Sequence, residues 1–120
     1  MERFRWEGIG NRIVLKQDFS DLNNIEVKKY IKKAENMIKN RGVKNIIVLA
    51  NVKNINIDKY TLKIIENSYC QNKGYIERVI IYGLENNIQI KQKFSKELID
   101  KKIDVFKKEN EAMQWISNIK

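Results

Sequence analysis

Apolar and polar residues at the start of the chain follow the two-residue period of a β-strand. Phe4 and Trp6 alternate with charged residues across residues 3–7, and this alternation is typical of a strand with one buried face. A second stretch, residues 12–17, is rich in β-branched and aliphatic residues. The link between them, residues 8–11, contains two glycines, which suit a tight turn. The pattern therefore predicts an N-terminal β-hairpin.

A period of three to four residues replaces the strand period in four longer stretches, as expected for amphipathic helices. These stretches span residues 24–41, 58–72, 87–99 and 109–119. In the first of them, lysines fall mainly on the face opposite the apolar residues. We expect Asn23 or Asn24 to cap this helix and Gly42 to follow its end.

Short apolar runs rich in β-branched residues lie between the predicted helices. They span residues 45–51, 77–82 and 103–106. Such runs suit strands that are buried on both faces, as in a parallel sheet, and strands that alternate with helices pair through right-handed crossovers. We therefore predict one α/β domain over residues 1–120. It is a sandwich with a four- or five-stranded mixed sheet, in which the N-terminal β-hairpin is followed by α-β-α-β-α-β-α.

The composition excludes most enzyme chemistry. The chain has no His, so it lacks the commonest general base and the commonest metal ligand. Its single cysteine, Cys70, cannot form an internal disulfide or a cysteine-based zinc site, and we expect it to be a half-buried packing residue. We interpret the acidic pairs as helix caps or surface charges rather than metal ligands. These pairs are Asp18/Asp21, Asp100/Asp104 and Glu109/Glu111. We thus predict no catalytic residue, no cofactor and no metal.

The formal net charge of +9 is a weaker signal than it first suggests. The chain contains 19 Lys, 20 Ile and 15 Asn, residues whose codons are dominated by A and T, so coding bias inflates the basic excess. A basic surface still favours polyanions, but the aromatic interleaving that single-strand binding uses is missing. The longest apolar run, residues 46–50, is far too short to span a bilayer. We expect a cytosolic, bacterial-type protein without a targeting segment.

Motifs along nearly the whole chain resemble those of one family. After the predicted hairpin and long helix comes the strand of residues 46–52, and residues 76–83 contain Arg78-Val79 and end in Gly83. The last motif is Val105-Phe106 followed by Glu109-x-Glu111-Ala112-x-x-Trp115-Ile116. These are similar to the "RVAVVG" strand and the "F…EEA..WL" ending of the SpoIIAA-like (STAS/SEC14-like) family of small bacterial proteins. The motifs are packing signatures and are not catalytic.

The resemblance implies a phospho-acceptor position. In phospho-regulated STAS domains, a Ser or Thr at the start of the helix after the central strand accepts a phosphate, which meets the positive end of that helix. The matching stretch here is residues 54–61, where Asp58 stands near the acceptor position and Thr61 is a more remote candidate. Asp58 would either mimic permanent phosphorylation or act as an ordinary helix N-cap, and we favour the cap. This departure argues against a kinase-driven switch.

The family resemblance implies a non-enzymatic regulatory or protein-interaction domain, as in anti-sigma factor antagonists, with a protein partner. We expect Asn56, Asp58 and Trp6 to contribute to its interaction surface. Trp6 would either close the core or belong to a homodimer surface. Two alternatives stay open: a small apolar-ligand or lipid-binding protein, since the related SEC14-like architecture holds apolar ligands, and a basic nucleic-acid-binding module.

Overall fold

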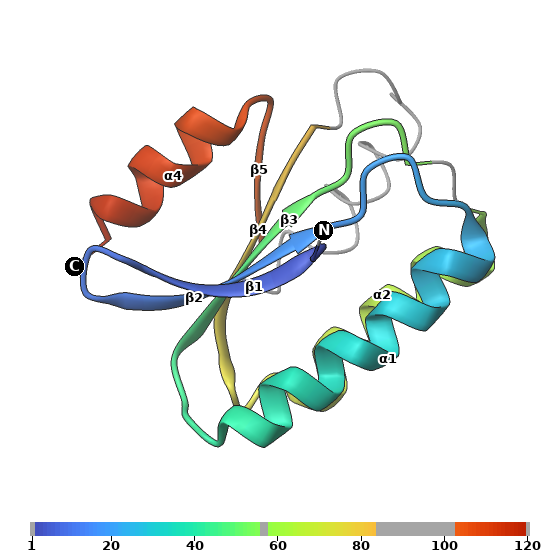
Figure 1. Cartoon of the computed structure of the whole chain (residues 1–120), viewed down its shortest axis with the longest axis horizontal. Coiled ribbons are helices and arrows are strands. Elements are labelled where there is room, and N and C mark those ends of the chain that lie inside the picture. Colours follow the sequence, from blue (N-terminus) through green and yellow to red (C-terminus); the bar gives the residue numbers. More distant parts are fainter. Residues whose placement is uncertain (1, 56–57, 84–102, 120) are drawn as a thin grey trace.

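The structure, a computed structural model, describes residues 2–55, 58–83 and 103–119, and these form an α/β arrangement of one mixed sheet and three helices (Figure 1). The strands are β1 (Phe4–Ile9), β2 (Arg12–Asp18), β3 (Ile46–Asn51), β4 (Ile76–Tyr82) and β5 (Ile103–Phe106). The helices are α1 (Asn24–Arg41), α2 (Lys59–Asn72) and α4 (Glu109–Ser117). The helix predicted over residues 87–99 lies outside the described residues. In the ranges described, the predicted α/β class and mixed sheet are confirmed, with five strands.

The N-terminal hairpin is tighter than the sequence pattern suggests. Strands β1 and β2 pair antiparallel from Phe4 opposite Gln17 to Ile9 opposite Arg12. The turn is therefore only two residues long, and its first residue, Gly10, has φ 60°. A two-residue hairpin turn needs positive φ at this position, which glycine adopts without strain.

The sheet has the order β1-β2-β3-β4-β5, and all pairs after the hairpin are parallel. Each parallel connection therefore moves one strand further in the same direction. Right-handed crossovers that all move in one direction place their helices on the same face. Accordingly, α1 and α2 lie together on one face of the sheet, while α4, which follows the last strand, lies on the other (Figure 1).

Helix α1 begins and ends where its sequence signals predict. The Asn23 side chain accepts a hydrogen bond from the Glu26 backbone N–H at 2.9 Å, and the Glu26 carboxylate accepts one from the Asn23 N–H at 3.3 Å. This reciprocal pair satisfies two of the free N–H groups of the first turn. Gly42 ends the helix with φ 68°, the left-handed conformation that suits glycine.

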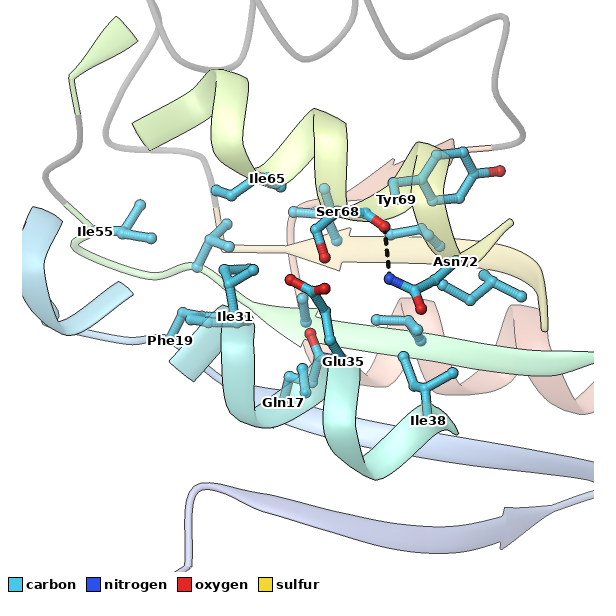
Figure 2. A pocket seen from close by; sticks show the side chains of 17 residues that line it. Gln17, Phe19, Ile31, Glu35, Ile38, Ile55, Ile65, Ser68, Tyr69 and Asn72 are labelled. Atoms are coloured by element: carbon cyan, nitrogen blue, oxygen red, sulfur yellow. Dashed lines mark hydrogen bonds between the residues drawn. The ribbon is translucent and has the colours of Figure 1, made fainter. Parts of the chain in front are cut away.

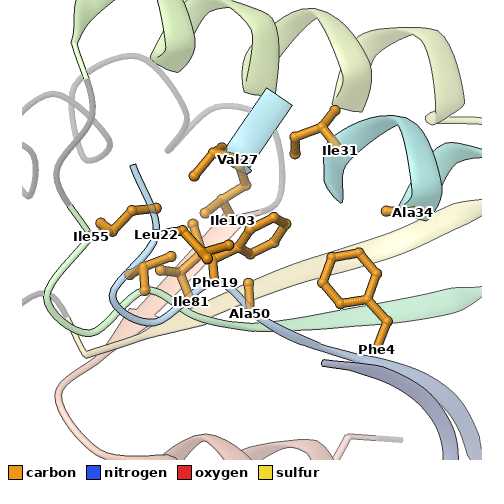
Figure 3. Packing of buried hydrophobic residues seen from close by; sticks show 11 residues of the cluster. Phe4, Phe19, Leu22, Val27, Ile31, Ala34, Ala50, Ile55, Ile81 and Ile103 are labelled. Atoms are coloured by element: carbon orange, nitrogen blue, oxygen red, sulfur yellow. The ribbon is translucent and has the colours of Figure 1, made fainter. Parts of the chain in front are cut away.

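The sheet separates two apolar layers because successive side chains of a strand point to opposite faces. On the α1/α2 face, Figure 3 shows the aromatic rings of Phe4 and Phe19 among aliphatic side chains from α1, the sheet and the adjoining loops. On the α4 face, a smaller cluster is buried. It consists of Ile9, Val14, Ile47, Leu49, Ile80, Ala112 and Ile116.

The two motifs that carry the family resemblance pack against each other on the α4 face. The Arg78 guanidinium of β4 lies 5.5 Å from the ring centroid of Trp115 on α4. Ala112, on the same helix, is completely buried. Gly83 follows β4 with φ 96°, and a Cβ there would lie 2.9 Å from the Lys53 backbone nitrogen. Glycine is therefore required by both conformation and close backbone approach. The prediction that these motifs are packing signatures is confirmed.

Cys70 is exposed on α2, so the prediction of a half-buried packing residue is wrong. Ser68 and Asn72 face the interior of the structure. A residue two positions away from each of them is rotated by about 200° around an α-helix. Cys70 therefore points to solvent although its neighbours on the helix do not.

Candidate functional site

Asp58 lies at the start of α2, the helix that follows the central strand β3, and it is the N-cap residue. Its carboxylate accepts a hydrogen bond from the Thr61 backbone N–H at 2.8 Å. This bond is the main cause that lowers the pKa of Asp58 below its ordinary value, and the charge of Lys28 lowers it further. The prediction that Asp58 caps the helix is confirmed.

The beginnings of α1 and α2 are held together at this position. The Asp58 backbone N–H donates a hydrogen bond to Asn24 Oδ1, the side chain of the first residue of α1, at 2.8 Å. The first residue of α1 therefore provides the acceptor for the backbone N–H of the residue that caps α2. Since helix N-termini leave free N–H groups, such bonds fix the relative positions of the two first turns.

Two large apolar side chains stand in solvent within two residues of this hydrogen bond. Ile25 on α1 is 79% exposed and Tyr60 on α2 is 80% exposed. Exposed lysines lie next to them on the same turns of α1, at Lys28 and Lys29. We name Ile25, Lys28, Asp58 and Tyr60 the helix-start surface. Ile25 and Tyr60 were not predicted as site residues. Both fall outside the inward-facing apolar period of their helices, and this is a signal that the sequence carries.

Two other predicted site residues do not contribute to this surface as described. Asn56 lies outside the described residues. Thr61 is completely buried, with 0% of its surface exposed, so a kinase would have no access to its hydroxyl in this structure.

Trp6 lies far from the helix-start surface. Its ring packs against the buried side chains of Leu15, Ile38, Ile46 and Val48, and the Arg41 guanidinium covers it at 4.9 Å from the centroid. Arg41 is the last residue of α1, whereas Asn24, which holds Asp58, is the first. An 18-residue helix is about 27 Å long. Of the two predicted roles for Trp6, this packing favours core closure, and the structure does not bring Trp6 and Asp58 together.

A second candidate site is a cavity of about 80 Å³ between α1, α2 and the sheet. Its walls are mostly aliphatic side chains of α1, β3, α2 and β4 (Figure 2). Polar side chains also line it, among them Gln17, Glu35, Ser68 and Asn72. A mainly apolar cavity with a few convergent polar groups is the usual form of a small-molecule site.

Asn72 is the unusual member of this group. It is 1% exposed, and its side-chain NH2 donates to the Ser68 carbonyl at 2.8 Å (Figure 2). Its oxygen, Oδ1, is buried and accepts no hydrogen bond. A buried acceptor without a donor costs about 1–3 kcal/mol. The cavity was not predicted from the sequence, because an Asn at the end of a helix is ordinarily a surface residue.

The carboxyl edge of the sheet, where many α/β proteins bind ligands, is a weaker candidate. The described strands run in sequential order, without the reversal that opens a crevice at that edge. A depression of about 240 Å³ is present there, but several of its polar groups are already paired with each other. The Tyr82 hydroxyl donates to Glu109 at 2.6 Å, and the Asn51 side chain accepts from the Lys53 N–H at 3.0 Å.

Four carboxylates of the predicted acidic pairs accept hydrogen bonds, namely those of Asp18, Asp104, Glu109 and Glu111. Asp18 accepts from Ser20, Asp104 accepts from Arg78 at 3.3 Å, and Asp100 lies outside the described residues. Over 2–55, 58–83 and 103–119, no three carboxylate or thiol groups gather closely enough to hold a metal ion. In the same ranges, no helix combines the length and apolar character that crossing a membrane requires.

The helix-start surface and the cavity are thus the two candidates that the geometry supports. One is exposed and apolar with charged neighbours, and the other is buried and apolar with polar groups. No protein-family model, curated protein or solved structure matches this chain, so its function has to be inferred from its own residues.

Proposed function

We propose that the chain is a non-enzymatic regulatory domain of the STAS type, resembling the anti-sigma factor antagonist-like proteins, and that it acts by binding a protein partner. In this proposal residues 1–120 form one domain, with an N-terminal hairpin followed by α-β-α-β-α-β-α. The observation that carries the proposal is the position of the exposed apolar side chains. Ile25 and Tyr60 stand in solvent beside Asp58, which in this proposal lies near the STAS phospho-acceptor position.

Exposed apolar groups of this size favour burial against a partner. Covering a large aliphatic or aromatic side chain gains about 1.5–3 kcal/mol, and aromatic side chains are enriched at protein interfaces. The hydrogen bond between Asp58 and Asn24 connects the first turns of both helices, which lowers the cost of ordering the backbone of this surface on binding.

The charge around the helix-start surface defines the partner. Lys28 and Lys29 lie exposed on α1, and the same face continues with Lys32 and Lys33. Complementary charge steers association and selects partners. The proposed partner is therefore a protein that presents an apolar contact flanked by acidic residues.

Asp58 gives this surface a constant negative charge. A phosphorylated Ser or Thr at a helix start would supply charge and hydrogen-bond acceptors there, and the Asp58 carboxylate already accepts the Thr61 N–H. In our proposal the domain therefore keeps one binding state and needs no kinase.

A photo-crosslinking experiment tests this proposal. Tyr60 is replaced by a benzoyl-phenylalanine in the full chain expressed in its own host cell, and products are identified by mass spectrometry after irradiation. The matched control carries the same group at Asn110, an exposed residue of α4 on the opposite face of the sheet. We expect one acidic protein to be crosslinked from position 60 and not from position 110, and to be lost in an Ile25→Ser variant.

Other outcomes discriminate against the proposal. A product with twice the mass of the chain would identify a homodimer in place of a second protein. Crosslinks to nucleic acid, together with binding that weakens steeply as salt rises, would favour the basic nucleic-acid-binding module. Equal products from positions 60 and 110 would show that the helix-start surface is not an interface.

A further inference from the structure

We propose that the cavity between α1 and α2 binds a short aliphatic primary amine in its ammonium form. The inference rests on the cavity and its polar groups, and it does not depend on the protein partner proposed above.

The size of the cavity limits the ligand to a few atoms. An engineered apolar cavity of about 150 Å³ holds benzene, and this one has about 80 Å³. That volume suits a chain of about three to four non-hydrogen atoms. Aliphatic side chains such as Ile31, Val48 and Val79 line it, so the body of the ligand is apolar.

The polar groups of the cavity call for a hydrogen-bond donor. Asn72 Oδ1 is buried without a partner, and the Asn72 NH2 is already used by Ser68. The carboxylate of Glu35 lines the same cavity and can only accept when it is ionised. Figure 2 shows the polar ends of Glu35, Ser68 and Asn72 gathered between the two helices. A ligand that only accepts hydrogen bonds would leave the Asn72 oxygen unpaired.

The charge of Glu35 selects an ammonium group over a neutral donor. An ammonium has three N–H donors, which suit the acceptors of Asn72, Glu35 and Ser68. A buried charge is costly unless it is paired, and the Glu35 carboxylate supplies that pairing. Hydrogen bonds in which the donor or the acceptor is ionised are roughly twice as strong as neutral ones.

The exposure of the polar side chains differs along the cavity and indicates where a ligand would enter. Asn72 is 1% exposed, whereas Glu35 and Ser68 are half-buried. The polar side of the cavity therefore reaches the surface between α1 and α2, and the apolar tail would lie toward the sheet.

An NMR titration of the full chain tests the inference with three probes of the same length: n-propylammonium, n-propanol and propionate at pH 7. We expect n-propylammonium to give saturable shifts of backbone amides in residues 31–38 and 65–72. We expect n-propanol to bind about tenfold more weakly and propionate to give no saturable shift. Propionate binding as tight as that of n-propylammonium, or no saturable shift with n-propylammonium, would overturn the proposal.

Two variants and one control locate the site. Asn72→Leu should lower the affinity for n-propylammonium at least about tenfold, while Asn67→Leu, the same change on the exposed side of α2, should leave it unchanged. Glu35→Gln should abolish the preference for n-propylammonium over n-propanol, because the buried ammonium then lacks its charged partner. Unchanged binding in Asn72→Leu would show that the amine binds elsewhere, and unchanged amine preference in Glu35→Gln would remove the carboxylate from the site.

Discussion

The two faces of the sheet are packed by different rules. On the α4 face, Ile47, Ile80 and Ala112 have no exposed surface, and Arg78 and Phe106 cover Trp115 at the edge of that layer. On the α1/α2 face, a cavity of about 80 Å³ remains. The buried oxygen of Asn72 there has no hydrogen-bond partner.

This difference separates residues that maintain the fold from residues that are available for function. Protein interiors are normally packed as densely as organic crystals, and buried polar groups are normally paired. The α4 layer follows both rules where the structure describes it, and its residues are explained by stability. The α1/α2 layer departs from both, and such departures are expected at functional sites.

Loss of a buried side chain from the α4 face should have the largest effect. Ile116 is 1% exposed, so Ile116→Ala should destabilise the protein by about 3 kcal/mol because it removes buried methyl groups and leaves a cavity. Urea denaturation measures the free energy of unfolding. The control, Ile25→Ala at a position 79% exposed, should change it by less than about 0.5 kcal/mol. Similar losses in both variants would contradict the packing described for α4.

Enlarging a buried alanine on each face of the sheet should have different effects on stability. Ala112 is completely buried on α4, and Ala34, 5% exposed, lines the cavity. Ala112→Val should cost about 2 kcal/mol because the layer has no room, while Ala34→Val should cost less than half of that because the cavity accepts the added methyl groups. Both changes carry the same helix-propensity cost, so the difference reports free volume. Equal destabilisation in thermal unfolding would show that the cavity is not available to side chains.

The hydrogen bond at the edge of the α4 face should make a smaller contribution. Tyr82 donates to Glu109 at 2.6 Å, and Tyr82→Phe should cost about 1 kcal/mol at pH 7. Burial, together with the hydrogen bond to Glu109, raises the pKa of Tyr82 above its ordinary value of 10.0. A raised pKa in the folded state stabilises the fold below pH 10.0, and this contribution is lost as the pH rises above that value. The difference in unfolding free energy between wild type and Tyr82→Phe should therefore shrink above pH 10.0, and a constant difference up to pH 11 would refute it.

The smallest effect on stability is expected at Asp58, which belongs to the exposed helix-start surface. Asn caps helices as well as Asp does, so Asp58→Asn should leave the melting temperature at pH 7 nearly unchanged, whereas Asp58→Ala should lower it. The pKa of Asp58 is lowered from 3.8 by the Thr61 N–H, so the carboxylate contributes above pH 3.8 and loses its contribution as the pH falls below it. Only wild type should show this acid dependence. If Asp58→Asn also loses the crosslinked partner, the charge serves binding rather than capping.

Much of the fold was predictable from periodicity and end signals. The bounds of α1 follow from Asn23 and Gly42, and β3 and β4 follow from continuous apolar runs, because these are local properties of the chain. The hairpin turn was predicted two residues too long, since Gly8 and Ile9 extend the strand through pairing with Ile13 and Arg12. The prediction that Cys70 is half-buried was wrong, because the exposure of a helix residue depends on how α2 is rotated about its axis relative to the sheet.

The candidate sites were less predictable. Asp58 was found because helix capping is a local signal. Asn72 and Glu35 were not, because they are far apart in the sequence and line one cavity only when α1 packs beside α2. Trp6 and Asp58 were grouped on one surface, but the length of α1 separates them.

By itself, the sequence determined the α/β class, the positions of most strands and helices, the caps of α1 and α2, and the absence of histidine chemistry. These depend on residue types and on spacings along the chain. Tertiary structure alone decided which apolar residues stay exposed, as at Ile25 and Tyr60, and where a cavity and an unpaired oxygen remain. Those features depend on how separate elements pack, because burial and hydrogen-bond partners come from residues that are distant in sequence.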